Sequence, residues 1–63
     1  MKLKMIIDDK DKKFYIDTEK IEAIKCIKID YYFLMYIFLP NQKIELKFEN
    51  EEDLNNAING LKG

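Results

Sequence analysis

The chain lacks histidine, serine, arginine, tryptophan and valine, and it has only one cysteine, one proline and two glycines in 63 residues. Without serine there is no serine nucleophile, and without histidine the single Cys26 has no imidazole base to activate it. One cysteine cannot form a disulfide within the chain, and a structural zinc site is not expected without histidine. These absences predict a protein that is not an enzyme and that holds no metal or cofactor.

Strong charge of either sign is also missing. The chain has 11 lysines against 12 aspartates and glutamates, a formal net charge of −1. A general nucleic-acid binder is expected to be strongly basic, so nucleic acid is not the favoured partner. Aromatic residues make up 13% of the chain, which argues against disorder. The length fits one domain, residues 1–63.

Long apolar segments are absent too. The start, MKLKMIIDDK, has three apolar residues in a row before two aspartates, which is too short for the core of a secretory signal. The longest apolar run, YYFLMYIFL at 31–39, has nine residues, whereas a membrane-spanning helix needs about 20. We therefore expect a cytoplasmic protein that does not contact a membrane.

Alternating residues predict several short strands. Residues 2–8 predict a half-buried strand with Leu3, Met5 and Ile7 on its apolar side. A turn at 8–12 and a second short strand at 13–17 follow, and then a polar break at 17–20. Residues 21–29 fit either a strand or a short helix, and their four isoleucines favour the strand.

The second half of the chain has clearer patterns. The run 32–39 predicts a strand that is apolar on both faces, residues 40–41 a turn, and residues 42–49 a strand with strict alternation. Asn50 is placed to cap a C-terminal helix that ends at Gly60 or Gly63. An apolar stripe follows the helical period at Leu54, Ala57, Ile58 and Leu61. The predicted fold class is α+β: an antiparallel sheet of four to five short strands with the one helix packed on one face.

Three local features have plain structural explanations. Asp8, Asp9 and Asp11 lack the spacing of a calcium loop and are expected in a solvated turn. Cys26, placed among isoleucines, is expected to be a small buried core residue. The densest acidic cluster suits the positive end of a helix dipole; it comprises Glu49, Glu51, Glu52 and Asp53.

The run 32–39 raises the question of a partner, because one helix covers only one of its two apolar faces. One face carries Tyr31, Phe33, Met35, Ile37 and Leu39 and the other Tyr32, Leu34, Tyr36 and Phe38. The sequence leaves open which face points outward. An uncovered strip of four large side chains could reach roughly 600 Å², close to one side of an ordinary interface. If the second face is outward, Tyr32, Leu34, Tyr36 and Phe38 form the contact, and a second copy of the chain is the expected partner. The alternative is a sheet that curls into a small barrel and hides the strip.

A nucleic-acid platform is a further alternative. Aromatic residues flanked by lysine bind single strands, and four lysines could share the outer face with the aromatic run: Lys2, Lys4, Lys43 and Lys47. The lack of arginine, the presence of Glu45 in the same row and the net charge argue against it.

Two stretches carry a family resemblance: FYIDTEKIEAI at 14–24 and YIFLPNQKIELKFENEEDLNNAI at 36–58, about two thirds of the chain. Together they resemble the small FlbD-type accessory proteins of bacterial flagella and swarming, and small phage proteins of the same pattern. Pro40-Asn41-Gln42 stands where that family usually has Asn-Gly. The resemblance implies a non-enzymatic protein that works by contact.

The expected function is therefore that of a small protein–protein interaction module. Its partners would be a second copy and, for a phage- or mobile-element-encoded inhibitor, a host protein. The alternatives are a motility or flagellar accessory protein and a single-stranded nucleic-acid-binding module.

Overall fold

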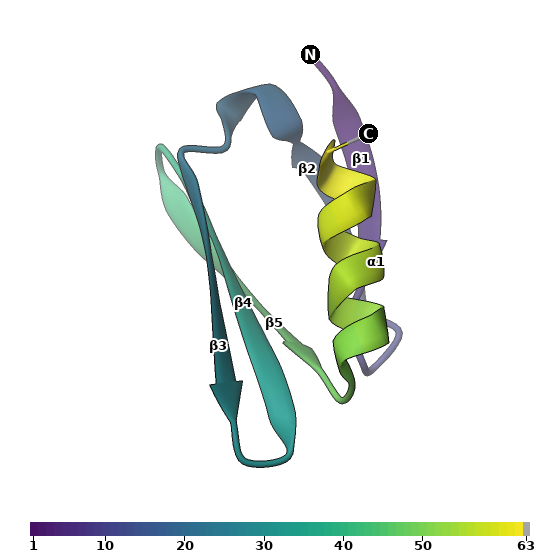
Figure 1. The fold of residues 1–63 in the computed structure, drawn as a ribbon. Helices are drawn as coiled ribbons and strands as arrows, with labels where there is room; N and C mark the ends of the chain where they lie inside the picture. The colour runs from purple at the N-terminus through teal and green to yellow at the C-terminus, as the bar shows by residue number, and fades with distance from the viewer. Residues whose placement is uncertain (63) are drawn as a thin grey trace.

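The computed structural model describes residues 1–62 (Figure 1). In chain order the elements are β1 (Leu3–Ile7), β2 (Lys13–Asp17), the 3-10 helix η1 (Thr18–Lys20), β3 (Ala23–Ile29), β4 (Tyr32–Leu39), β5 (Gln42–Phe48) and α1 (Glu51–Lys62). The strands form a two-stranded sheet, β1-β2, and a three-stranded sheet, β3-β4-β5, both antiparallel. The predicted α+β class with one C-terminal helix is confirmed, with its five strands divided between two sheets.

The hairpin β1-β2 forms where it was predicted, but its buried side is the opposite one. Leu3, Met5 and Ile7 are 54%, 44% and 42% exposed, whereas Ile6 is only 4% exposed. The interpretation of Leu3, Met5 and Ile7 as the buried side of the strand was therefore wrong. The cause lies in β2, because Ile6 pairs with Phe14 and so turns to the same face. That face packs on the helix, so the register of the hairpin decides which side chains of β1 enter the core.

The segment that fitted either strand or helix is a strand, β3. It pairs along its whole length with β4, from Ala23 opposite Phe38 to Ile29 opposite Tyr32. The two-residue turn at Asp30 and Tyr31 joins these strands, and Asp30 has φ 39°, a conformation that aspartate tolerates better than most residues. The preference of the β-branched isoleucines for a strand therefore outweighed the helical spacing in this segment.

Helix α1 begins where its capping residue predicted. The Asn50 Oδ1 atom accepts a hydrogen bond of 2.8 Å from the backbone N–H of Asp53, and the Leu54 N–H donates to the Asn50 carbonyl. Helix α1 continues through Gly60 to Lys62, so the prediction that Gly60 ends it was wrong. A glycine within a helix weakens it but does not stop it unless the backbone turns there. The alternative end, Gly63, lies outside the described residues.

The core lies between the hairpin, the three-stranded sheet and the helix (Figure 1). Met35 and Ile37 of β4 are 0% exposed, and Phe14 and Phe33 pack against the buried cluster from its margin. The buried cluster is Ile6, Ile16, Met35, Ile37, Leu46, Phe48, Leu54, Ala57 and Leu61. Within residues 1–62, no helix is both long enough and apolar enough to cross a membrane.

Candidate protein-interaction surface

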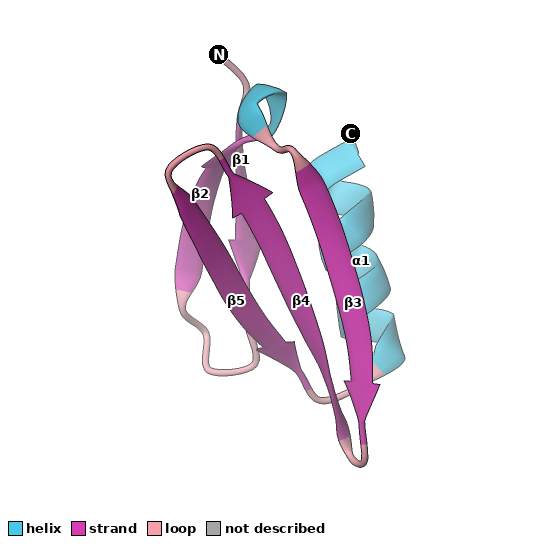
Figure 2. Cartoon of the chain, turned by 90° about the vertical axis from the view of Figure 1, so that its left-hand side faces the viewer, coloured by secondary structure: helices cyan, strands magenta, loops and turns pink. Residues whose placement is uncertain are grey.

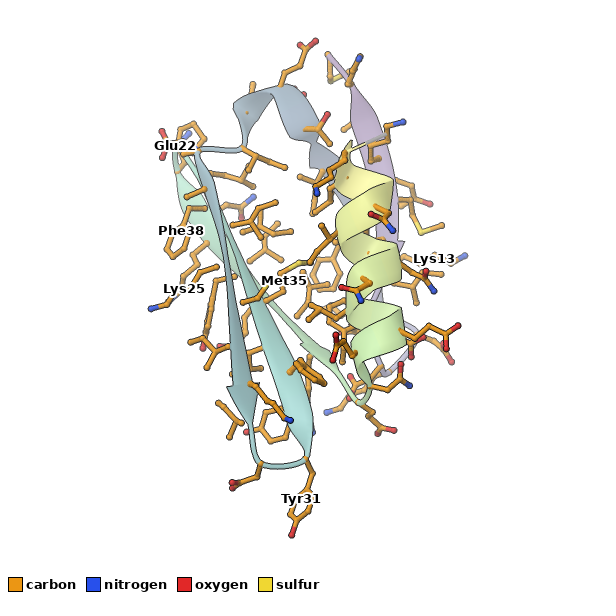
Figure 3. All side chains as sticks on the ribbon, in the orientation of Figure 1. Lys13, Glu22, Lys25, Tyr31, Met35 and Phe38 are labelled. Carbon is orange, nitrogen blue, oxygen red and sulfur yellow. The ribbon has the colours of Figure 1, made fainter. Side chains whose placement is uncertain are left out.

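Strand β4 presents different residues to the two faces of its sheet. Met35 and Ile37 point into the core, and so the even-numbered residues point away from it. Figure 3 shows this division, with Met35 directed toward the helix side and Phe38 on the other side of the sheet. The outward row of β4 consists of Tyr32, Leu34, Tyr36 and Phe38, the residues expected to form a contact if this face were outward.

The neighbouring strands complete this outer face. On β3, Ile27 and Ile29 lie opposite Leu34 and Tyr32 and extend the apolar strip toward the edge of the sheet. On β5, charged residues lie opposite β4 instead. We call the whole surface the outer face; it consists of the outward row of β4 together with Ala23, Lys25, Ile27, Ile29, Lys43, Glu45 and Lys47.

Two lysines of β5 partly cover the tyrosines of β4. The Lys43 Nζ atom lies 5.0 Å from the centre of the Tyr36 ring, and the Lys47 Nζ atom lies 4.6 Å from the centre of the Tyr32 ring. Both distances are in the range of cation–π attraction, and the lysine stems shield the rings from water. All four outward residues of β4 are half-buried. The apolar area available to a partner is therefore smaller than the roughly 600 Å² expected for four fully uncovered side chains.

Tyr36 also interacts with an acidic neighbour. It lies directly opposite Glu45 on β5. Hydrogen bonding of its hydroxyl to the Glu45 carboxylate, and then partial loss of solvent, raise the pKa of the Tyr36 phenol above its ordinary value. Coulombic repulsion from Glu45 acts in the same direction, and repulsion from Tyr32 adds to it. The raised pKa favours the neutral form of the Tyr36 phenol on the outer face.

The acidic turn at 8–12 has an internal structural role. The Asp8 Oδ1 atom accepts hydrogen bonds of 2.9 Å from the backbone N–H groups of both Lys10 and Lys12. This side chain therefore closes the turn, and Asp11 has φ 61° within it. Across residues 1–62 there is no group of three Cys, Asp or Glu side chains arranged to hold a metal ion.

Cys26 does not lie in the core. It is exposed, so its prediction as a small buried core residue was wrong. It pairs with Met35 and shares the inner side of the sheet, but β3 is the outermost strand and the core cluster has no residue from it. Partial loss of solvent raises the pKa of the Cys26 thiol, which disfavours the reactive thiolate.

The lysines expected to share one face lie on different sheets. Lys43 and Lys47 do flank the aromatic residues of the outer face. Lys4 belongs to β1 in the separate hairpin, and Lys2 lies just before that strand. The acidic residues at the beginning of the helix lie where they were predicted. Glu51, Glu52 and Asp53 are in the first turn of α1.

The hairpin carries a second apolar surface that the sequence analysis missed. Tyr15, 66% exposed, pairs with Met5 and lies beside Leu3 and Ile7 on the side away from the core. Leu3 and Tyr15 also line an open groove of about 460 Å³, whose floor includes Ile16. The alternation in residues 2–8 was the signal for this surface, but it was assigned to the wrong side of the strand.

A second open groove, of about 380 Å³, lies between β1, the 8–12 turn and helix α1. Ile6, Phe48 and Ala57 contribute apolar floor, and the rim is acidic. The aspartates in its lining are Asp8, Asp9, Asp11 and Asp53. These four aspartates are the acid–base side chains of the lining.

Comparisons with known proteins found no matching family model, no matching curated protein and no matching solved structure.

Proposed function

We propose that the protein is a non-enzymatic protein–protein interaction module that forms a homodimer through the outer face of its three-stranded sheet. The observation that carries this proposal is the outward row of β4. Tyr32, Leu34, Tyr36 and Phe38 point away from the core, on the face opposite to the one that α1 covers.

The composition of this face suits an interface better than a permanently solvated surface. Tyrosines can bury their rings and keep their hydroxyls at a wet rim. A two-fold contact would stack Tyr36 and Phe38 of each copy against the apolar row of the other. A chain of this size has a marginal core, so association would add to its stability.

The charges on the outer face predict how the dimer responds to salt. Lys25, Lys43 and Lys47 outnumber Glu45 there, so two identical faces repel each other weakly. At 0.1 M salt, interactions between exposed charges more than about 10 Å apart are largely screened. The homodimer is therefore expected to tighten, not weaken, as the salt concentration rises.

Light scattering behind a sizing column tests the proposal. At tens of micromolar the expected mass is twice the chain mass of 7.6 kDa. Tyr36→Lys and Phe38→Glu each place a charge against a desolvated partner surface and should restore the mass of one chain. Tyr15→Lys is the matched control, because Tyr15 is exposed on the hairpin and lies away from the outer face. A wild-type mass near 7.6 kDa under these conditions would refute the homodimer.

The cellular role of such a module has two candidates. A phage- or mobile-element-encoded inhibitor would use this surface, or a dimer built on it, against a host protein. A motility accessory protein would bind a flagellar component instead. A pull-down from the source host, with Tyr36→Lys as the negative control, separates the two by the identity of the captured protein.

One observation favours a second function, binding of single-stranded nucleic acid. The Nζ atoms of Lys43 and Lys47 lie over the rings of Tyr36 and Tyr32 on one exposed face, an arrangement that combines phosphate attraction with base stacking. Fluorescence polarisation with a labelled 20-mer of thymidine at low salt tests it. Binding that is lost on Tyr36→Ala and on raising the salt would support this function, whereas no binding at 50 mM salt would exclude it.

A further inference from the structure

Strand β3 has a partner on one side only. It lies at the end of the strand order β3-β4-β5 and pairs with β4 alone (Figure 2). All residues from Ala23 to Cys26 are exposed, and Ile24 is 40% exposed although it shares the inner side of the sheet with Ile37. Apolar side chains of β3 are therefore accessible on both sides of the sheet.

The tight turn at Asp30 and Tyr31 indicates which backbone groups of β3 are free. Ile29 and Tyr32 are the pair that closes this two-residue turn, and such a pair exchanges both of its hydrogen bonds. Hydrogen-bonded and non-hydrogen-bonded pairs alternate along an antiparallel ladder. The backbone N–H and C=O groups of Ile24, Cys26 and Lys28 therefore point away from β4, toward the open edge.

The protection of this edge against unselective pairing consists of its two lysines, Lys25 and Lys28. Natural sheets protect their edges with charged side chains, especially lysine, or with proline, bulges or a covering helix, because a bare edge pairs with other strands. Strand β3, AIKCIKI, has no proline and pairs with β4 in unbroken register. The charged residues of β3 are Lys25 and Lys28. Helix α1 contributes to the core cluster, but no residue of β3 belongs to that cluster.

We propose that the open edge of β3 accepts an extended segment of another protein as an added strand, and that this segment carries carboxylates. The backbone groups of Ile24, Cys26 and Lys28 would supply the hydrogen bonds, as in other complexes formed by strand addition. Apolar residues on both faces of the segment would cover Ile24 on one side of the sheet and continue the apolar strip of Ile27 on the other.

The charges of β3 identify the chemistry of the segment. Lys25 projects from the outer face and Lys28 from the inner side, and the strand contains no acidic residue. Neither lysine takes part in an ion pair closer than 4.0 Å within residues 1–62, and the Lys28 Nζ atom lies 5.9 Å from the centre of the Phe33 ring. Both ammonium groups can therefore meet carboxylates of a partner. A second copy of β3 would bring two more lysines and no acid to the edge. Complementary charge therefore favours a foreign acidic strand over self-pairing.

This edge is a different surface from the outer face, so the proposal does not depend on the homodimer. Stacking two copies through their outer faces leaves one β3 edge open on each. The dimer test reads the mass of the assembly, whereas the edge test reads peptide binding and the protection of particular amides. Failure of one is therefore distinguishable from failure of the other.

The test uses labelled nine-residue peptides with the repeat Val-Val-Glu-Glu or Val-Val-Lys-Lys, so that each face of the added strand carries both apolar and charged residues. The glutamate peptide should bind in fluorescence polarisation at least tenfold more tightly than the lysine peptide at low salt. Changing both lysines, Lys25→Glu with Lys28→Glu, should reverse this preference. In hydrogen exchange measured by NMR, the bound glutamate peptide should slow the amides of Ile24, Cys26 and Lys28 by at least tenfold. Amides that already bond to β4 should change little.

A proline substitution tests the backbone role directly. Cys26→Pro removes an N–H that points to the open edge and leaves the β3-β4 ladder its bonds, so affinity should fall at least tenfold. Cys26→Ala keeps the N–H and should bind like the wild type. If Cys26→Pro fails to fold, a glutamate peptide with N-methylated backbone tests the same bonds on the wild-type protein and should lose at least tenfold in affinity.

Two results would overturn the proposal. One is a glutamate peptide that neither binds saturably at millimolar concentration nor protects the three alternate amides. The other is protection of these amides that appears without peptide and rises with protein concentration, which would assign the edge to a second copy.

Discussion

Replacing Asn50 by alanine should destabilise the protein by a predictable amount, because Asn50 makes three contacts at the start of α1. Its Oδ1 atom accepts from the Asp53 N–H at 2.8 Å, its Nδ2 atom donates to the Asp53 carboxylate at 3.2 Å, and its carbonyl accepts from the Leu54 N–H. Asn50→Ala removes the first two and keeps the third. The orphaned Asp53 N–H then depends on water.

The magnitude follows from the cap. Loss of a capping side chain costs about 1 kcal/mol, within a range of about 0.5–2 kcal/mol. The Asn50 side chain is solvent-exposed, so no buried polar group is created and the middle of that range applies. For a domain of about 60–100 residues, 1 kcal/mol shifts the melting temperature by roughly 4–8 °C.

Urea denaturation followed by circular dichroism measures this effect. Asn50→Ser keeps an oxygen acceptor and loses the bond to the Asp53 carboxylate, so it should retain most of the stability. Asn55→Ala is the matched control, because it removes the same amide from an exposed position within the helix. If the urea midpoint of Asn50→Ala equals that of the wild type and the slope of the denaturation curve is unchanged, the bond from the Asp53 N–H to Asn50 does not stabilise the start of the helix.

Three further predictions use other parts of the molecule. Ile6→Ala should cost about 2–5 kcal/mol because Ile6 is 4% exposed, whereas Met5→Ala, at 44% exposure, should cost far less; equal losses would contradict the side assigned to β1. Gly60→Ala should stabilise the protein by about 1 kcal/mol, because a Cβ there meets no atom within 4 Å and the helix continues through it; a loss of stability would contradict this. Ultraviolet titration should place the pKa of Tyr36 above its ordinary value, and Glu45→Gln should lower that pKa. The stability contributed by the neutral phenol should be present at neutral pH and disappear as the pH rises through the pKa of the folded protein. An unchanged pKa in Glu45→Gln would exclude Glu45 as the cause.

Several elements could be predicted because their determinants lie within a few residues of one another. The strict alternation in 42–48 and the double-sided apolar run at 32–39 each match a strand of the structure. The helix start at Asn50 depends on one side chain and the N–H three residues further on. Local patterns of this kind identify an element without knowledge of its neighbours.

The side that each strand buries could be predicted less well. Residues 2–8 contain Leu3, Met5 and Ile7 in alternation, and only Ile6 lies on the other side with an apolar side chain. Ile6 is nevertheless the buried residue, because its pairing partner Phe14 faces the core. Cys26 shows the same limit, since an apolar context did not place it in the core. Burial depends on which neighbour covers a position, and that neighbour is distant in the sequence.

The sequence by itself determined the α+β class, the order of the elements and the presence of an apolar strand, β4, with more apolar surface than one helix covers. Periodicity and capping are local, so the chain specifies them directly. Tertiary structure alone decided that Tyr32, Leu34, Tyr36 and Phe38 point outward, that Lys43 and Lys47 lie over two of those rings, and that β3 keeps an open edge. The physical reason is that a side-chain period of two makes both faces of a strand equivalent until pairing and helix packing choose one of them.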